Sequence, residues 1–166
     1  MNIRALKEAD IPRCLEIYGY YVENTCFTLE EETPSPADFA KRCLSIAGRY
    51  PFIVIENDAG TVVGYAYPDT FNPRSAYRIT ADLSVYVSSD RLHEHIGGML
   101  LRGIEARAAA YGIKNIVSII TDENENSLSF HLNNGFVTEG HIRDTAVKFG
   151  KVLGVYYLRK ALAPSV

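Results

Sequence analysis

Residues 85–101 read VYVSSDRLHEHIGGMLL, and this stretch carries the strongest structural signal in the chain. It has the pattern of a strand, a tight loop and the start of a helix. The first amides of a helix have no intrahelical acceptor, and the helix dipole favours negative charge beside them. The junction is therefore a candidate phosphate cradle, and the plain alternative is an ordinary turn from strand to helix. The amides that would face a diphosphate belong to Glu94, His95, Ile96, Gly97 and Gly98.

The loop is unusual because His95 stands where a close approach of phosphate favours glycine. Histidine tolerates a positive φ better than most residues, so the turn remains feasible. A phosphate nearby would favour the charged imidazolium of His93 or His95. A metal site at these two histidines is disfavoured, because no third ligand is indicated.

Apolar periodicity predicts the elements on either side of this stretch. Predicted strands cover 3–6, 52–56, 61–67, 77–87, 115–121, 136–147 and 151–159, and predicted helices cover 8–22, 37–46, 96–111 and 125–133. Turn residues at 57–60 and 149–150 indicate two hairpins. Helices interleaved with a largely antiparallel sheet predict a mixed α/β fold.

Composition narrows the class of protein. The 166 residues suffice for one domain with a full core, so we expect a single domain over 1–166. A net charge of −3 argues against nonspecific nucleic-acid binding, and no apolar run approaches the roughly 20 residues of a membrane span. The N-terminus lacks a signal-peptide core, and three cysteines match no metal spacing. We therefore expect a cytoplasmic protein with free thiols and no nucleic-acid, membrane or metal partner.

Two further groups of polar residues are candidates for chemistry. Asn124 is a good helix N-cap, and it shares a helix face with Ser127 and His131 after a predicted strand. His131 is a candidate general acid with a pKa near neutrality, and capping with a partly exposed histidine is the alternative. Asp82 lies inside a predicted strand, where a carboxylate is disfavoured unless it is solvated, paired or functional.

Two arginines, Arg74 and Arg78, lie in an aromatic-rich loop just before the Asp82 strand. A guanidinium fork suits a carboxylate or phosphinate on a substrate. A solvated loop with structural salt bridges is the alternative.

Short motifs, each weak alone, are spread over the whole chain. They are Glu16-Ile17-Tyr18, residues 25–31 with Pro34, Tyr50-Pro51, Val63-Gly64-Tyr65-Ala66-Tyr67, Ala76-Tyr77-Arg78, Ser84-Val85-Tyr86-Val87, Glu123-Asn124 with Ser127 and His131, Gly135-Phe136 and Lys148-Phe149-Gly150-Lys151. On these motifs the chain resembles the GNAT superfamily of N-acetyltransferases. Within it, the chain is similar to the phosphinothricin/methionine sulfoximine acetyltransferase branch.

The resemblance implies the GNAT fold, a twisted, mostly antiparallel mixed sheet flanked by helices. The sheet would splay between the 82–87 and 115–121 strands and hold acetyl-CoA as cosubstrate in the split. The implied cofactor contacts are Val85, Tyr86 and Val87 with Asn124 and Ser127 on the pantetheine, and residues 93–98 (His93 and Glu94 included) on the diphosphate. The implied substrate contacts are Phe27, Asn72, Pro73, Arg74, Asp82, Leu83 and Ser84. The loop over 25–30 would close the pocket, with a homodimer as the expected assembly.

The chain departs from the family's motifs at three places. The family's phosphate loop reads Q/R-x-x-G-x-G/A, whereas this chain has Leu92-His93-Glu94-His95-Ile96-Gly97. The usual glutamate on the third strand is Asp82, which is one methylene shorter. The usual Trp-Leu-Asp near the C-terminus is Val152-Leu153-Gly154.

The expected reaction is direct transfer of an acetyl group from acetyl-CoA to the primary amine of a small amino-acid-like substrate in a ternary complex. Asp82, directly or through water, would take the amine proton, and the Val85 amide would polarise the thioester carbonyl. His131 would face the sulfur and protonate the thiolate. Cys26 is a poor candidate for an acyl-carrying nucleophile, because no base is evident beside it.

Two alternatives stay open. The altered phosphate loop suggests a non-catalytic CoA-binding or sensing module. Acetylation of protein N-termini or polyamines is the other, although polyamines would favour an acidic pocket over Arg74 and Arg78. The sequence does not name the acceptor amine.

Overall fold

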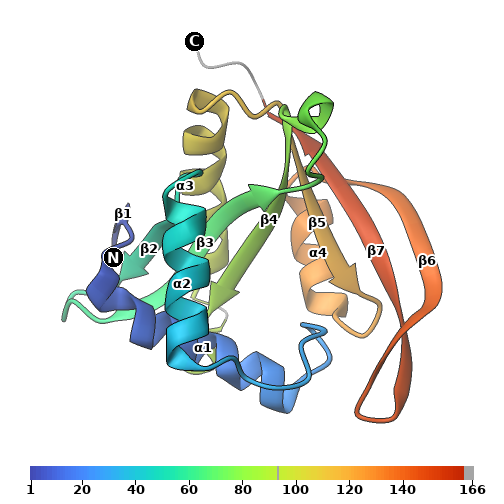
Figure 1. Ribbon diagram of the computed structural model, residues 1–166, viewed down its shortest axis with the longest axis horizontal. Coiled ribbons are helices and arrows are strands. Elements are labelled where there is room, and N and C mark those ends of the chain that lie inside the picture. Colours follow the sequence, from blue (N-terminus) through green and yellow to red (C-terminus); the bar gives the residue numbers. More distant parts are fainter. Residues whose placement is uncertain (93, 163–166) are drawn as a thin grey trace.

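One seven-stranded sheet organises the computed structural model, which describes residues 1–92 and 94–162 (Figure 1). The strand order is β1-β2-β3-β4-β5-β7-β6. The strands are β1 (Asn2–Ala5), β2 (Ile53–Glu56), β3 (Val62–Thr70), β4 (Thr80–Val87), β5 (Asn115–Thr121), β6 (Val137–Lys148) and β7 (Lys151–Ala161). The helices are α1 (Ile11–Asn24), α2 (Pro36–Ala47), α3 (Ile96–Ala110) and α4 (Glu125–Asn133), with 3-10 turns η1 (Glu8–Asp10), η2 (Ser75–Tyr77) and η3 (Ser89–Arg91). The predicted mixed α/β fold and its order of elements are confirmed.

Local sequence signals explain where the helices begin. Ser35 caps α2 by accepting a hydrogen bond from the Asp38 amide at 3.1 Å, and Asn124 caps α4 by accepting from the Ser127 amide at 3.2 Å. The first helix begins later than predicted, because Glu8–Asp10 form a 3-10 turn before it. The strand predicted to begin at Tyr77 begins at Thr80, because Ser75–Tyr77 also form a 3-10 turn.

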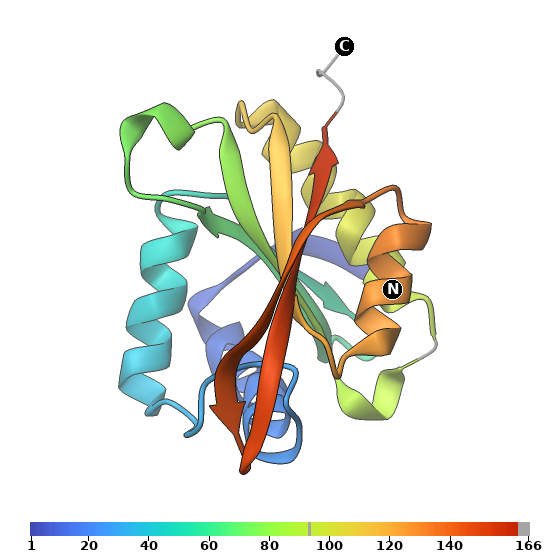
Figure 2. The same ribbon diagram turned by 90° about the vertical axis from the view of Figure 1, so that its right-hand side faces the viewer.

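Helices cover both faces of the sheet (Figure 2). On one face, α1 and α2 bury aromatic residues such as Tyr18 and Phe39 against Phe52 and Tyr65. On the other face, α3 packs against the sheet through an aliphatic cluster centred on Leu100, Ile104 and their neighbours. Each such side chain stabilises the fold by about 1.5–3 kcal/mol when it is fully buried. None of the helices in the described part of the chain is long and apolar enough to cross a membrane.

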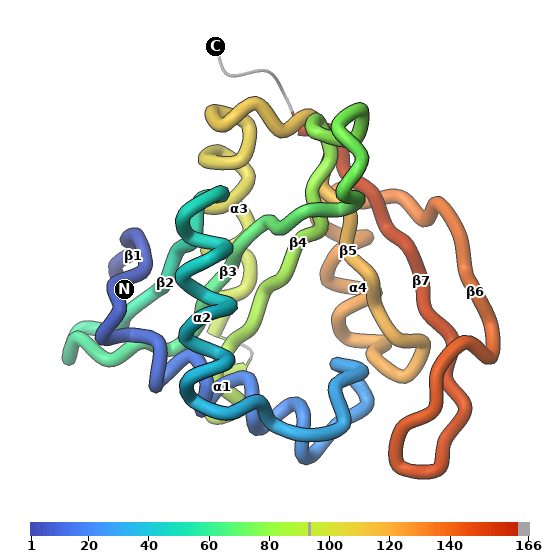
Figure 3. The backbone as a smooth tube through the Cα atoms, viewed as in Figure 1, coloured from blue at the N-terminus to red at the C-terminus, as the bar shows by residue number. Residues whose placement is uncertain are grey.

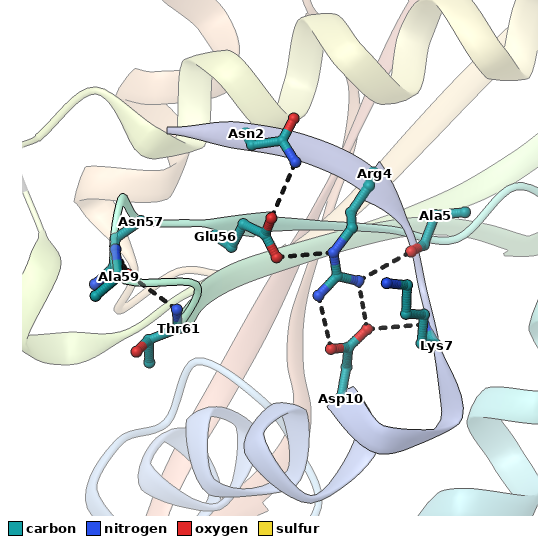
Figure 4. Close-up of polar contacts among 9 residues, drawn as sticks. All are labelled: Asn2, Arg4, Ala5, Lys7, Asp10, Glu56, Asn57, Ala59 and Thr61. Atoms are coloured by element: carbon teal, nitrogen blue, oxygen red, sulfur yellow. Dashed lines mark hydrogen bonds and ion pairs between the residues drawn. The ribbon is translucent and has the colours of Figure 1, made fainter.

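The first strand is tied to the fold by an ionic network (Figure 4). The guanidinium of Arg4 donates to both oxygens of Asp10, at 2.7 and 2.9 Å, and to Glu56 at 2.8 Å. The Asp10 carboxyl is buried, and its hydrogen bonds from Arg4 lower its pKa. The network joins β1, η1 and β2 at one end of the sheet, well away from β5.

The centre of the sheet is split. Strands β4 and β5 run parallel and pair over only three positions, of which the last joins Asp82 to Val117. Beyond that point β4 stays paired with β3 as far as Val87, and β5 stays paired with β7 as far as Thr121. Each strand therefore follows a different half of the sheet, and the two diverge as a V in the backbone trace (Figure 3). The predicted splay is confirmed.

Candidate active site

A cavity of about 870 Å³ lies where β4 and β5 separate. Its walls come from β4, β5, the start of α3, helix α4 and the segment after α1. Successive side chains of a strand point to opposite faces, and the cavity touches Ser84 and Tyr86 as well as Val85 and Val87. The cavity therefore reaches both faces of the sheet through the split.

Most of the predicted site residues meet in this cavity. Those lining it are Phe27, Leu83, Ser84, Val85, Tyr86, Val87, His95, Ile96, Gly97, Gly98, Asn124, Ser127 and His131. Asp82 lies next to Leu83 at the apex of the split. The side chain of Glu94 pairs with Arg91 at 3.4 Å instead. His93 lies outside the described residues.

The candidate phosphate cradle lies at a turn from strand to helix. His95 has a φ of +59° and directly precedes α3, so the helix begins at Ile96 with its amides facing the loop. A Cβ atom at Gly97 would touch the Phe130 ring at 3.5 Å, and one at Gly98 would lie 3.4 Å from Nη1 of Arg102. Both glycines line the cavity at the start of α3, and the free amides of a helix start suit an anion.

Two arginines at this end of the cavity are not among the site residues predicted from the sequence. Arg91 precedes the cradle, and Arg102 reaches back from the second turn of α3. Arg102 follows Gly98 by four positions, so the two share a helix face; that spacing is visible in the sequence. Both arginines line the same cavity as Leu92, the position where the motif of the resembled family has its leading polar residue.

Unsatisfied polar groups also face the split. The Oγ atom of Ser118 on β5 is buried and finds no hydrogen-bond partner within the described residues. A buried polar atom without a partner calls for an explanation, and a bound water or ligand is one. On β4, the edge of residues 83–87 opposite β3 is not paired with β5. The chain therefore offers hydrogen bonds along both arms of the V, as an extended amide-bearing ligand such as pantetheine requires.

Asp82 has the electrostatics of a base. Burial is the main cause that raises its pKa to about 6, and the neighbouring carboxylate of Asp69 adds to the rise. At pH 7 to 8 the carboxylate is still mostly ionised, yet it holds a proton far better than an ordinary aspartate. A pKa close to the working pH favours proton transfer.

His131 has a different environment from the one that its sequence suggests. The ring is buried on α4 against the edges of Phe130 and Phe136. Its Nδ1 lies 2.8 Å from the carbonyl oxygen of Ser127, so Nδ1–H donates there. Burial lowers the pKa of the imidazole below its ordinary value, so the ring is neutral at pH 7. In that tautomer Nε2 accepts a proton and does not donate one.

The predicted substrate residues of the β3–β4 connection lie apart from the cavity lining. Pro73, Arg74 and Arg78 are exposed and Asn72 is half-buried, on the segment that leads into β4. The Arg74 amide donates to Oδ1 of Asn72 at 3.1 Å, and Nη1 of Arg78 lies 3.4 Å from the Ser75 carbonyl oxygen. Both guanidinium groups are thus close in sequence to Asp82 and open to solvent.

The loop after α1 forms the wall that carries Phe27. Lys148 on β6 is almost fully buried, and its Nζ donates to the Thr28 carbonyl at 2.9 Å. Glu30 accepts from both guanidinium nitrogens of Arg42, at 2.6 and 3.0 Å. Burial raises the pKa of the Cys26 thiol in the same loop, which disfavours it as a nucleophile. All three cysteines are free.

The departure at Gly154 has a structural cause. The Gly154 amide donates to Oδ2 of Asp122 at 2.9 Å. A Cβ atom at position 154 would lie 2.7 Å from Oδ2 of Asp122 and 2.7 Å from Nε2 of His141. A side chain at position 154 would therefore clash with Asp122 and His141 as they are placed here.

Residues 3–153 match the family model described as an acetyltransferase (GNAT) domain. The chain is similar to a phosphinothricin N-acetyltransferase of Alcaligenes faecalis, with 31% identity over 97% of this chain and 82% of the relative. It is also similar to an L-methionine sulfoximine/L-methionine sulfone acetyltransferase of Pseudomonas aeruginosa, with 33% identity over 99% of this chain and 96% of the relative.

A solved structure shows the same architecture. It is that of a GNAT superfamily phosphinothricin acetyltransferase from Sinorhizobium meliloti in complex with acetyl-CoA, which superposes with a TM-score of 0.94 at 32% identity. The match covers 98% of this chain and 88% of the other. Within residues 1–92 and 94–162, no group of three histidine, cysteine or acidic residues is placed to hold a metal ion.

Proposed function

The chain belongs to the GNAT acetyltransferase family, and from this premise we propose that it moves the acetyl group of acetyl-CoA directly to the primary amine of a small amino-acid-like substrate in a ternary complex. Acetyl-CoA, the cosubstrate of this family, supplies an acetyl group activated as a thioester. The observation that carries the proposal is the split between β4 and β5, where a large cavity begins beside a carboxylate of raised pKa.

The cradle and the two arms of the V would hold the cosubstrate. We assign the diphosphate to the amides of residues 94–98, with the charges of Arg91 and Arg102 beside them. We assign the pantetheine to the backbone of residues 85–87, to Asn124 and Ser127, and to the unsatisfied Ser118 hydroxyl. We also assign His95 and, outside the described residues, His93 to the diphosphate.

Asp82 would act as the base. An aliphatic ammonium has a pKa near 10 and must lose a proton before its nitrogen attacks a carbonyl. Asp82 takes this proton directly or through a bridging water and passes it to solvent. The Val85 amide on the unpaired edge of β4 would polarise the carbonyl oxygen.

His131 would lie at the sulfur end of the site. A neutral imidazole returns a proton to the departing thiolate only after it has gained one itself, and its burial opposes that step. A thiol with a pKa of about 8.5 is already a fair leaving group. We therefore expect His131 to contribute less to the rate than Asp82.

The acceptor is proposed from the relatives and from the arginines before β4. The relatives' names give phosphinothricin and L-methionine sulfoximine or sulfone as their substrates. These molecules combine a primary amine with acidic or strongly polar groups, which Arg74 or Arg78 would attract. The other proposed substrate contacts are Phe27, Asn72, Pro73, Leu83 and Ser84. We further propose that the chain works as a single cytoplasmic domain and forms a homodimer.

The test measures thiol release from acetyl-CoA over a panel of amines, beside the thermal shift that acetyl-CoA produces. The panel contains phosphinothricin, methionine sulfoximine, methionine sulfone, spermidine and a peptide with a free N-terminus. Turnover of the amino-acid-like amines is the expected result. Binding of acetyl-CoA without turnover of any amine would instead indicate a sensing module, which the curated acetyltransferase relatives do not favour.

A further inference from the structure

Two acidic residues face each other at the apex of the split. Asp69 on β3 lies directly opposite Asp82 on β4 in the antiparallel register. Residues in that relation point to the same face, with Cβ atoms about 4.5–5.5 Å apart, and like charges there are destabilising. The sheet therefore places a second negative charge beside the proposed base, in a position that stability alone would not select.

The two carboxylates have unequal partners. Oδ1 of Asp69 lies 3.3 Å from Nη2 of Arg49 and also accepts the Thr70 amide at 2.7 Å. Within residues 1–92 and 94–162, Asp82 forms no ion pair with a basic side chain. Asp69 therefore has a basic partner that Asp82 lacks.

Arg49 is about half exposed and contacts several neighbours. Its Nε donates to the Ser45 carbonyl at 3.2 Å, and its Nη1 donates to the Thr70 hydroxyl at 3.1 Å. Its guanidinium lies over the Tyr50 ring, 5.7 Å from the centroid. The segment after α2 thus brings a cation to the end of β3, where it contacts Asp69 and Thr70.

Arg74 and Arg78, on the segment that leads into β4, are exposed, and within the described residues no basic side chain of the other elements pairs with Asp82. On β5, Val117 lies opposite Asp82. Arg159 of β7 lies opposite Val117, and its Nε pairs with Oε1 of Glu139 at 2.5 Å. On the α1 and α2 face, Arg42 is bound to Glu30. Tyr67 and Tyr86, the titratable neighbours on β3 and β4, keep their hydroxyl protons, because burial raises both pKa values.

We propose that Asp69 and Arg49 are positioning residues of the acetyl-transfer site, which together set how readily Asp82 accepts the proton of the substrate ammonium. This inference rests on the proposed role of Asp82 as the base. The negative charge of Asp69 strengthens the hold of Asp82 on a proton, and Arg49 limits that effect by neutralising part of the charge. In the step itself the ammonium N–H bond breaks, and the proton passes to a carboxylate oxygen of Asp82 and then to solvent.

Two variants shift the pH dependence of kcat/KM in opposite directions if this is correct. Asp82 has to be deprotonated, so the rate falls as the pH drops through its pKa. Asp69→Asn removes a neighbouring negative charge and moves the acid limb to lower pH by roughly one unit. Arg49→Gln leaves Asp69 less compensated and moves the limb to higher pH. Asp58→Asn is the matched control, because Asp58 is exposed on the β2–β3 turn and pairs with the N-terminal amine.

An NMR titration of the Asp82 carboxyl carbon reads the same pKa without turnover. Opposite shifts in the two variants, with none in the control, support the proposal. An unchanged acid limb and an unchanged titration in both variants overturn it. If Asp82→Asn retains near-normal turnover, the proposed role of Asp82 as the base is wrong. That failure can be told apart from failure of the present proposal, because the titration of Asp82 in the Asp69 and Arg49 variants does not depend on turnover.

Discussion

At the scale of single residues, the site depends on two buried titratable groups that respond differently to burial. Desolvation raises the pKa of Asp82 to about 6 and lowers that of His131. At pH 7 the first is a carboxylate with unusual basicity, and the second is a neutral ring with its proton committed to Ser127. Burial therefore favours Asp82 as the group that moves the amine proton.

Asp82→Asn is expected to lower kcat by about 10²- to 10⁴-fold, because it removes a positioned base while keeping the shape of the side chain. The Kd of acetyl-CoA should hardly change, since Asp82 lies outside the cavity lining. His131→Asn is expected to lower kcat by no more than about tenfold, because the thiolate of CoA is a fair leaving group even when no acid protonates it. Steady-state kinetics and calorimetry measure both, and a larger loss in the His131 variant would restore it as the main acid.

Arg102→Gln is expected to weaken acetyl-CoA binding by about tenfold, because it removes a cation beside the phosphate cradle. Arg107→Gln is the matched control one turn further along α3, where the guanidinium donates to the Gly103 carbonyl at 2.9 Å. The difference should shrink as salt is added. Equal affinities of the two variants in low-salt calorimetry would remove Arg102 from the phosphate site.

At the scale of elements, short-range signals explain which segments could be predicted. The strand Asn115–Thr121 and the helix Glu125–Asn133 were predicted with the boundaries that the structure has, because a β-branched run and the Asn124 cap mark them locally. The start of β4 was missed, since the 3-10 turn at Ser75–Tyr77 has no strong sequence mark. The place where β4 and β5 separate depends on pairing with other strands and is not a local property.

The β7 strand provides a test of packing at this scale. Gly154→Ala is expected to lower the free energy of unfolding by about 1–3 kcal/mol, because its Cβ atom would meet the Ile142 carbonyl oxygen at 2.9 Å as well as Asp122 and His141. Gly140→Ala on β6 is the control, since a Cβ atom there meets nothing within 4 Å. Urea denaturation measures the stability of both variants. Equal stability would show that the groups around Gly154 shift to make room for the added methyl group.

At the scale of the whole molecule, the long β6–β7 hairpin leaves apolar side chains without cover. Val147, Phe149 and Val152 are each more than half exposed near its turn, and Lys148 between them ties the hairpin to the loop that carries Phe27. A patch of this kind next to the pocket is typical of an interaction surface. This apolar patch supports the proposed homodimer, in which the loop that carries Phe27 would close the pocket.

Val152→Asp is expected to convert a dimer into a monomer, because it places a charge in the apolar patch. Val137→Asp is the control at the other end of the same strand pair, where the side chain is also about half exposed. Light scattering coupled to size-exclusion chromatography gives the mass of each. A wild-type protein that is monomeric at micromolar concentration would contradict the proposed dimer.

The sequence by itself determined the order of the elements, the mixed α/β class, the start of a helix at Ile96 and the family resemblance, because periodicity, caps and turn residues act over a few positions. Only the tertiary structure decided that Arg91 and Arg102 reach the cradle, that Asp69 stands opposite Asp82, and that Asp122 and His141 exclude a side chain at Gly154. It also decided that His131 is neutral. Strand register and burial depend on contacts between segments far apart in the chain, and these contacts set the charges and the pKa values of the site.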